Sequence, residues 1–217
     1  MRFYDERILP HLVDKACSMG QVMKLRQQLV PLARGRVLEV GMGSGVNLAL
    51  YNPEQVEHVY GLEPSEGMRR KALKNLESSP VSVEWLGLPG EQIPLADNSI
   101  DTVLLTFTLC TIPDWHTALQ QMKRVLKPGG ELLFLEHGEA PHETTRKWQH
   151  RITPGWKKIA GGCHLNRHIA DLIRQAGFEI TELENLYMPN APKIAGYLYK
   201  GRAVKPSEEA QGNAENP

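Results

Sequence analysis

The residues best suited to hold a small ligand lie in a glycine-rich stretch that follows the short apolar run at residues 37–40. Three glycines alternate along this stretch: Gly41, Gly43 and Gly45. Glycine adopts backbone angles that are closed to other residues, and its missing Cβ lets a ligand lie against the main chain. The pattern predicts a buried parallel strand, a tight turn and the start of a helix, with a small molecule bound at the turn.

The neighbours of the glycines indicate which small molecule is bound. A dinucleotide-binding turn has a further glycine where this chain has Val46, and it places a pyrophosphate at the helix N-terminus. Glu39 would repel a pyrophosphate but attract the ammonium and sulfonium groups of S-adenosylmethionine. In a partly buried site the Coulomb attraction between unlike charges is on the order of several kcal/mol. The pattern favours S-adenosylmethionine, and a tight turn that binds nothing is the alternative.

A second acidic residue follows the next predicted strand, residues 56–62. Glu63 lies 22 residues after Gly41 (63 minus 41), close to the spacing of about 20 at which an acidic side chain binds both ribose hydroxyls. Ser65 then suits the N-cap of a helix. Met68 in that helix would flank the adenine, or simply pack in the core.

Two further strands are predicted to end beside this turn. Residues 102–109 form an apolar, β-branched run typical of a central strand, and its carboxyl end at 106–111 falls where an open α/β sheet binds ligands. The next strand, at 131–135, brings Glu136 and His137 to the same edge.

The rest of the chain must supply the elements that hold these residues in place. Apolar residues at helical or alternating spacing predict those elements. Two helices are expected within residues 3–33 and one each at 46–51, from Ser65, from Asp114 and at 169–176, with further strands at 81–85, 178–186 and 193–200.

Composition limits the partners of the chain. Lysine plus arginine and aspartate plus glutamate both number 25 in 217 residues, so no net positive field attracts nucleic acid. The cysteines, Cys17, Cys110 and Cys163, are far apart and odd in number, which argues against a disulfide framework. Five of the eight histidines fall between residues 137 and 168, but no pair has the spacing of metal ligands, so no metal is expected.

The length favours a single domain over residues 1–204. Residues 205–217 lack apolar periodicity and are predicted to be a disordered tail. The charged first residues and the absence of a long apolar run predict no signal peptide and no stable membrane anchor. A cytoplasmic monomer or homodimer is expected.

Three motifs resemble those of the class I S-adenosylmethionine-dependent methyltransferases. Residues 39–45 match the first family motif, E/D-x-G-x-G-x-G, and residues 124–130 match the family stretch R-V-L-K-P-G-G. Residues 88–101 resemble the stretch G-D-A-E-x-L-P-F-x-D-x-S-F-D that binds adenine in the family. Pro89 replaces the acidic residue common there, so the adenine contact would fall to Gly90 or Glu91.

The resemblance implies a three-layer, Rossmann-like α/β fold with a mostly parallel seven-stranded sheet. The implied strand order is 3-2-1-4-5-7-6, with strand 7 antiparallel. The cofactor-binding residues expected on these grounds are Glu39, Gly41, Gly43, Ser44, Gly45, Asn47, Glu63, Pro64, Met68, Gly90, Glu91, Thr106 and Cys110.

A narrower resemblance concerns the methyl acceptor. Scattered residues look like those of small-molecule thiol methyltransferases and their bacterial relatives, which implies methylation of a small acceptor, such as a thiol. Acceptors of related families, a quinone precursor or a phospholipid headgroup, stay open, as does a non-catalytic S-adenosylmethionine-binding protein. The matching positions are Leu109–Cys110, Glu136–His137, Trp148–Gln149, Pro154, Trp156 and residues 162–167.

An acceptor thiol would have to lie in line with the methyl group and lose its proton. His137, at the sheet edge, is the candidate to orient or deprotonate the acceptor, and a structural role for it is the alternative. The N-terminal helices, within residues 1–34, and the insertion at 138–168 match the general cofactor scaffold poorly, so they are expected to form the acceptor side. The predicted acceptor pocket comprises Tyr4, Cys110, His137, Trp148 and His164.

Overall fold

The computed structural model describes residues 7–17 and 19–207, so Tyr4 and the predicted tail beyond residue 207 lie outside the described residues. Strands within this part form one sheet in the order β3-β2-β1-β4-β5-β7-β6, as predicted. Strand β7 runs antiparallel to both of its neighbours, and every other pair is parallel. The strands are β1 (Gly35–Val40), β2 (Val56–Leu62), β3 (Val83–Leu86), β4 (Ile100–Thr106), β5 (Leu126–His137), β6 (Glu179–Tyr187) and β7 (Tyr197–Val204).

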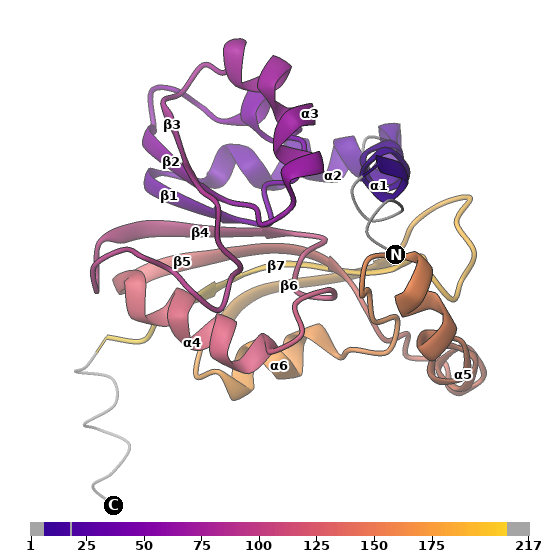
Figure 1. Ribbon diagram of the computed structural model, residues 1–217. Coiled ribbons are helices and arrows are strands. Elements are labelled where there is room, and N and C mark those ends of the chain that lie inside the picture. Colours follow the sequence, from indigo (N-terminus) through magenta and orange to yellow (C-terminus); the bar gives the residue numbers. More distant parts are fainter. Residues whose placement is uncertain (1–6, 18, 208–217) are drawn as a thin grey trace, which may run out of the picture.

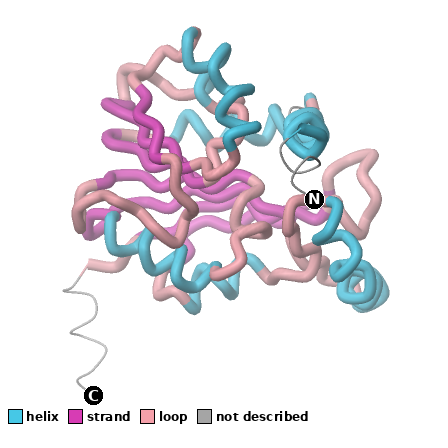
Figure 2. The backbone as a smooth tube through the Cα atoms, in the orientation of Figure 1, coloured by secondary structure: helices cyan, strands magenta, loops and turns pink. Residues whose placement is uncertain are grey.

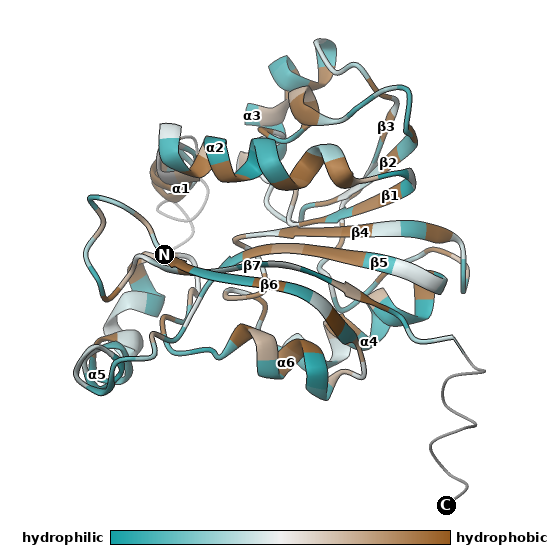
Figure 3. Cartoon of the chain, turned by 180° about the vertical axis from the view of Figure 1, so that it is seen from behind, coloured by the Kyte–Doolittle hydropathy of each residue, from teal (hydrophilic) through white to brown (hydrophobic). Residues whose placement is uncertain are grey.

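Helices cover both faces of the sheet (Figures 1 and 2). Helices α2 and α3 lie over one face, α4 and α6 lie over the other, and α1 and α5 lie at one end of the molecule (Figures 1 and 3). The described helices are α1 (Leu9–Cys17), α2 (Gly20–Leu29), α3 (Glu66–Glu77), α4 (Trp115–Val125), α5 (Glu143–Ile159) and α6 (Ile169–Gln175). Among these, no helix combines the length and apolar character needed to cross a bilayer.

Side-chain caps explain where two helices begin. The hydroxyl of Ser65 accepts a hydrogen bond from the backbone N–H of Met68, and a carboxylate oxygen of Asp114 accepts one from that of Thr117. Each cap satisfies a donor that the first turn of the helix leaves free. Both helix starts therefore lie at the residues that the sequence predicts.

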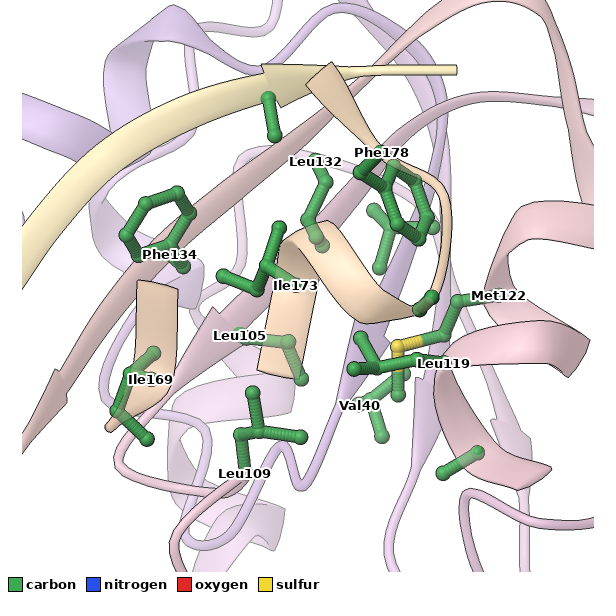
Figure 4. Close-up of a cluster of buried hydrophobic side chains, with 14 of the residues drawn as sticks. Val40, Leu105, Leu109, Leu119, Met122, Leu132, Phe134, Ile169, Ile173 and Phe178 are labelled. Carbon is green, nitrogen blue, oxygen red and sulfur yellow. The ribbon is translucent and has the colours of Figure 1, made fainter. Parts of the chain in front are cut away.

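The main hydrophobic core lies between the central strands and helices α4 and α6 (Figure 4). Val103 and Leu105 of β4, Leu132 of β5, Met122 of α4 and Ile173 of α6 are all fully buried. Strand β4 is buried along almost its whole length, which explains its near-continuous apolar sequence. The packing of these central strands fixes the position of the polar residues at their carboxyl ends.

The helix expected at residues 46–51 is instead a single 3₁₀ turn, Leu48–Leu50. Only residues 46–52 separate the last glycine of the turn from Pro53, and the residue before a proline is disfavoured in the helical region. So short a segment cannot offset the cost of starting an α-helix.

Two other segments differ from the sequence prediction. The insertion at 138–168 contains the long helix α5, which was not expected. The last strand begins at Tyr197 rather than at residue 193, because residues 188–196 form a turn closed by a hydrogen bond from the N–H of Met188 to the carbonyl of Gly196.

Candidate active site

The glycine-rich turn has the backbone geometry that requires glycine. Gly41, Gly43 and Gly45 all have positive φ angles, of 71°, 61° and 71°. A Cβ on Gly41 would lie 2.3 Å from the hydroxyl oxygen of Thr108. Residues with side chains therefore cannot replace Gly41 without strain and a clash, and the turn leaves bare main chain facing the space above it.

Glu63 lies at the carboxyl end of β2, beside this turn. One of its carboxylate oxygens accepts a hydrogen bond from the N–H of Gly43 at 3.0 Å, and the other accepts one from the N–H of Ser65 at 2.8 Å. Burial raises the pKa of Glu63, although these two hydrogen bonds oppose the shift. The carboxylate is thus fixed in orientation, and each oxygen keeps a lone pair for a further donor.

A cavity of 430 Å³ lies at the carboxyl ends of β1, β2 and β4. Its volume falls in the range of roughly 300 to 1,000 Å³ that is typical of small-molecule sites. Helix α1 and the segment after α5 also border it, through Leu9 and Gly161. The predicted cofactor-binding residues that line it are Gly41, Gly43, Ser44, Glu63, Pro64, Met68, Gly90, Glu91 and Thr106.

Four predicted cofactor-binding residues, Glu39, Gly45, Asn47 and Cys110, are not among the residues that line this cavity. Glu39 is 1% exposed and accepts hydrogen bonds of 2.7 Å from the side-chain amide of Asn47 and from the hydroxyl of Tyr51. Burial raises the pKa of Glu39, against the effect of these two donors. The structure therefore places Glu39 behind the glycine turn, within the protein's own hydrogen bonds, and direct contact with the cofactor stays a prediction.

Arg26, on α2, connects this buried acid to the cavity. Arg26 is 2% exposed, and its guanidinium donates hydrogen bonds of 2.7 Å to the side-chain oxygens of Asn47 and Thr106. It also lies over the ring of Phe107, 5.5 Å from the ring centroid. Phe107 has a φ of 59°, unusual for a residue with a side chain, and both Arg26 and Phe107 line the cavity. A positive charge is therefore present at the cavity wall.

The predicted acceptor-side residues do not all come together. His137, at the end of β5, lies against Cys163, with 3.3 Å between its Nε2 atom and the sulfur, and the sulfurs of Cys163 and Cys110 are 3.9 Å apart. His164 packs beside them, with Nδ1 3.1 Å from the carbonyl oxygen of Cys110. Trp148 is 51% exposed on α5 and is not among the cavity-lining residues.

The two sulfurs and the imidazole influence one another strongly. The contact with Cys163, together with burial, raises the pKa of Cys110. The contact with Cys110, together with the nearby His137, lowers the pKa of Cys163. Burial alone would lower the pKa of His137, but the adjacent Cys163 raises it. None of the three side chains lines the cavity, so the role of His137 as a base stays a prediction.

Comparison with known proteins identifies the family. Residues 38–134 match the methyltransferase domain family. The thiol S-methyltransferase TMT1B of Rattus norvegicus is 35% identical over 173 residues, which cover 78% of this chain and 70% of the relative. The chain belongs to the class I S-adenosylmethionine-dependent methyltransferases.

Further relatives of this methyltransferase differ in their acceptors. The demethylmenaquinone methyltransferase of Clavibacter sepedonicus is 26% identical, over 82% of this chain and 77% of the relative. An S-adenosylmethionine-dependent methyltransferase from Aquifex aeolicus has the same fold, with a TM-score of 0.62 at 20% identity, covering 90% of this chain and 97% of that structure. Membership of the S-adenosylmethionine-dependent methyltransferases gives S-adenosylmethionine as the cofactor, which suits a cavity with bare glycine main chain and a fixed carboxylate.

Sequence analysis did not single out Arg26 or Tyr51, and it placed Cys163 only among the positions that resemble thiol methyltransferases. Arg26 and Tyr51 lie in segments whose pattern indicates only helix or turn. Cys163 is far along the chain from Cys110 and His137, so the sequence does not reveal that its sulfur contacts them. The available signal was the adjacency of β4 and β5, because Cys110 lies in the loop after β4 and His137 is the last residue of β5.

Proposed function

We propose that this methyltransferase transfers a methyl group from S-adenosylmethionine to a small-molecule thiol. The observation that carries the proposal is the similarity, at 35% identity over 78% of the chain, to an enzyme named as a thiol S-methyltransferase. A quinone precursor is the second candidate, favoured by the more distant relationship to demethylmenaquinone methyltransferase.

The cavity residues suit particular parts of S-adenosylmethionine. Gly41 and Gly43 offer bare main chain, and Glu63 offers acceptors for the two ribose hydroxyls. Gly90 and Glu91 are proposed to contact the adenine, as the resemblance to the family implies. Arg26 supplies a positive charge at the cavity wall for the methionine carboxylate.

Methyl transfer places modest chemical demands on the protein. The cofactor supplies a methyl group on a positively charged sulfur. The protein must hold a nucleophile about 3 Å from the methyl carbon, opposite the sulfur that leaves, and must keep the two partners aligned. A thiol of ordinary pKa is a few per cent ionised at neutral pH, so positioning and modest help with ionisation are enough.

The test is a screen of acceptors with the release of S-adenosylhomocysteine as the readout. Small thiols should give saturable turnover, while matched alcohols of the same size should give none. A Gly43→Val variant, which fills the cofactor turn, controls for contaminating activity and should be inactive.

Turnover with a hydroquinone and none with thiols would replace the proposal by the second candidate. Calorimetric binding of S-adenosylmethionine with no turnover on any thiol, hydroquinone or phospholipid headgroup would indicate a non-catalytic binding protein instead.

A further inference from the structure

Three side chains of types that commonly ligate metals lie together in the interior beside the cofactor cavity. Cys110, His137 and Cys163 place two sulfurs and an imidazole nitrogen within 4.8 Å of one another. The sulfurs are 3.9 Å apart, and Nε2 of His137 is 3.3 Å from the sulfur of Cys163. Tetrahedral zinc with ordinary bond lengths separates two sulfurs by about 3.8 Å and a sulfur and a nitrogen by about 3.6 Å. The observed separations are close to those values.

Hydrogen bonds between the three segments hold these side chains together. The buried carboxylate of Glu136, next to His137, accepts hydrogen bonds from the N–H groups of Thr108 and Cys110. The N–H of His164, next to Cys163, donates to the carbonyl of Cys110 at 2.8 Å. Each ligand-bearing segment is thus fixed to the Cys110 loop, as expected of a preformed site.

We propose that Cys110, His137 and Cys163 form a binding site for one zinc ion. Two thiolates and a neutral imidazole would balance the charge of the ion. Soft sulfur ligands with an imidazole favour zinc over magnesium or calcium. A disulfide between the cysteines would instead require the sulfurs to approach to about 2.05 Å, which means a movement of nearly 2 Å within a packed interior.

The site has three protein ligands, which leaves the fourth position of a tetrahedral zinc for an exogenous ligand. Thr111 and Gly162, the chain neighbours of two of the ligands, both line the cofactor cavity. This extension of the proposal rests on the proposed function: the fourth ligand is the acceptor thiol. On binding it loses its proton to solvent, and its sulfur then forms a bond to the methyl carbon. The bond from that carbon to the sulfonium sulfur breaks, and the electron pair stays on the departing sulfur.

The first experiment measures metal without relying on activity. Reduced full-length protein, stripped of metal by a chelator, is titrated with Zn²⁺ and separately with Co²⁺, whose absorption reports tetrahedral sulfur ligation. We expect uptake of about one ion per chain, with loss of more than roughly 100-fold in affinity in Cys163→Ser and in His137→Ala. Cys17→Ser is the matched control, because it removes a thiol outside the cluster, and its metal affinity should equal that of the wild type.

Circular dichroism and thermal melting show whether each variant folds. The wild-type titration tests the proposal even if a variant fails to fold. Failure of the reduced wild type to take up either metal would overturn the proposal, as would equal loss of metal in Cys17→Ser. So would a cobalt spectrum without sulfur-to-metal charge transfer.

The acceptor part has its own readout. A thiol substrate added to the cobalt-loaded protein should increase the sulfur-to-cobalt absorption, whereas a matched alcohol should not. An unchanged spectrum, or full thiol methylation by metal-free protein, would refute the proposal that the acceptor thiol binds the metal. Absence of thiol methylation in zinc-loaded protein would refute the proposed function while leaving the metal titration intact.

Discussion

Replacement of Glu63 by glutamine tests whether this side chain binds the cofactor ribose. Glu63→Gln keeps the volume of the side chain but exchanges one acceptor oxygen for an amide donor. In the structure both oxygens of Glu63 accept backbone hydrogen bonds, from Gly43 and Ser65. The amide nitrogen of glutamine would therefore face an N–H group and could no longer accept from a ribose hydroxyl.

The size of the effect follows from the loss of one hydrogen bond to a charged acceptor. Such a bond contributes about 1.5 to 3 kcal/mol, which weakens binding of S-adenosylmethionine by about 10- to 150-fold. Because Glu63 is only 8% exposed, solvent cannot replace the lost acceptor easily. The loss should therefore lie well above the error of calorimetry.

Isothermal titration with adenosine and with 2′,3′-dideoxyadenosine localises the loss to the ribose. Glu63→Gln should weaken adenosine binding by the full factor and leave binding of the dideoxy compound nearly unchanged. Glu57→Gln, an exposed glutamate on the same strand, is the matched control and should bind both ligands like the wild type. Equal affinity of wild type and Glu63→Gln for adenosine, or equal weakening of both ligands, would refute the ribose assignment.

Three further predictions concern stability. Gly41→Ala should lower the free energy of unfolding by about 2 kcal/mol or more, measured in urea, whereas Gly129→Ala should lose less, because it has a similar φ of 74° but open space where the Cβ would lie. Burial would raise the pKa of Asp101, but hydrogen bonding lowers it overall. The ionised Asp101 carboxylate therefore stabilises the folded protein by about 1 kcal/mol above its ordinary pKa, and this stabilisation is lost on acidification below about pH 4. Asp101→Asn should therefore differ from wild type near neutral pH and converge with it in acid. Arg26→Met should destabilise the fold strongly, and the double variant with Glu39→Gln should lose less stability than the sum of the two single losses.

Much of the fold could be predicted because local patterns determine it. Apolar runs ending in glycine or acidic residues marked the parallel strands, and Ser65 and Asp114 marked helix starts by their capping chemistry. Helix α5 was missed because its buried face is polar: Gln149 and Thr153 are its buried residues. The amide of Gln149 binds the backbone of residues 138, 140 and 194, and hydrophobic periodicity cannot reveal such a role.

The sequence predicted residues that line the cavity at the glycine turn and grouped Cys110, His137 and His164, but it did not predict that Cys163 contacts Cys110 and His137. Gly41, Gly43 and Glu63 belong to short motifs whose geometry is local, so spacing along the chain predicts their place. Cys110 and Cys163 are far apart in sequence, and their sulfurs meet only because a loop after α5 returns to the end of β4. The spacing of residues along a single sequence therefore cannot predict that contact.

The contact of Arg26 with the buried network at Glu39 is also invisible in the sequence. Substitution of Arg26 tests whether Arg26 and Glu39 stabilise the protein jointly. Arg26 and Glu39 are bridged by Asn47, whose amide donates to the carboxylate and whose oxygen accepts from the guanidinium. Removal of one partner of a buried charge pair costs about 3 to 5 kcal/mol, since the other charge is left uncompensated. We therefore expect Arg26→Met to lose several kcal/mol in urea unfolding, while Arg34→Met, at an exposed arginine, changes little. The double variant Arg26→Met with Glu39→Gln should lose at least about 1 kcal/mol less than the sum of the single losses. Strictly additive losses would mean that Arg26 and Glu39 stabilise the protein independently, and that Arg26 does not compensate the buried acid behind the glycine turn.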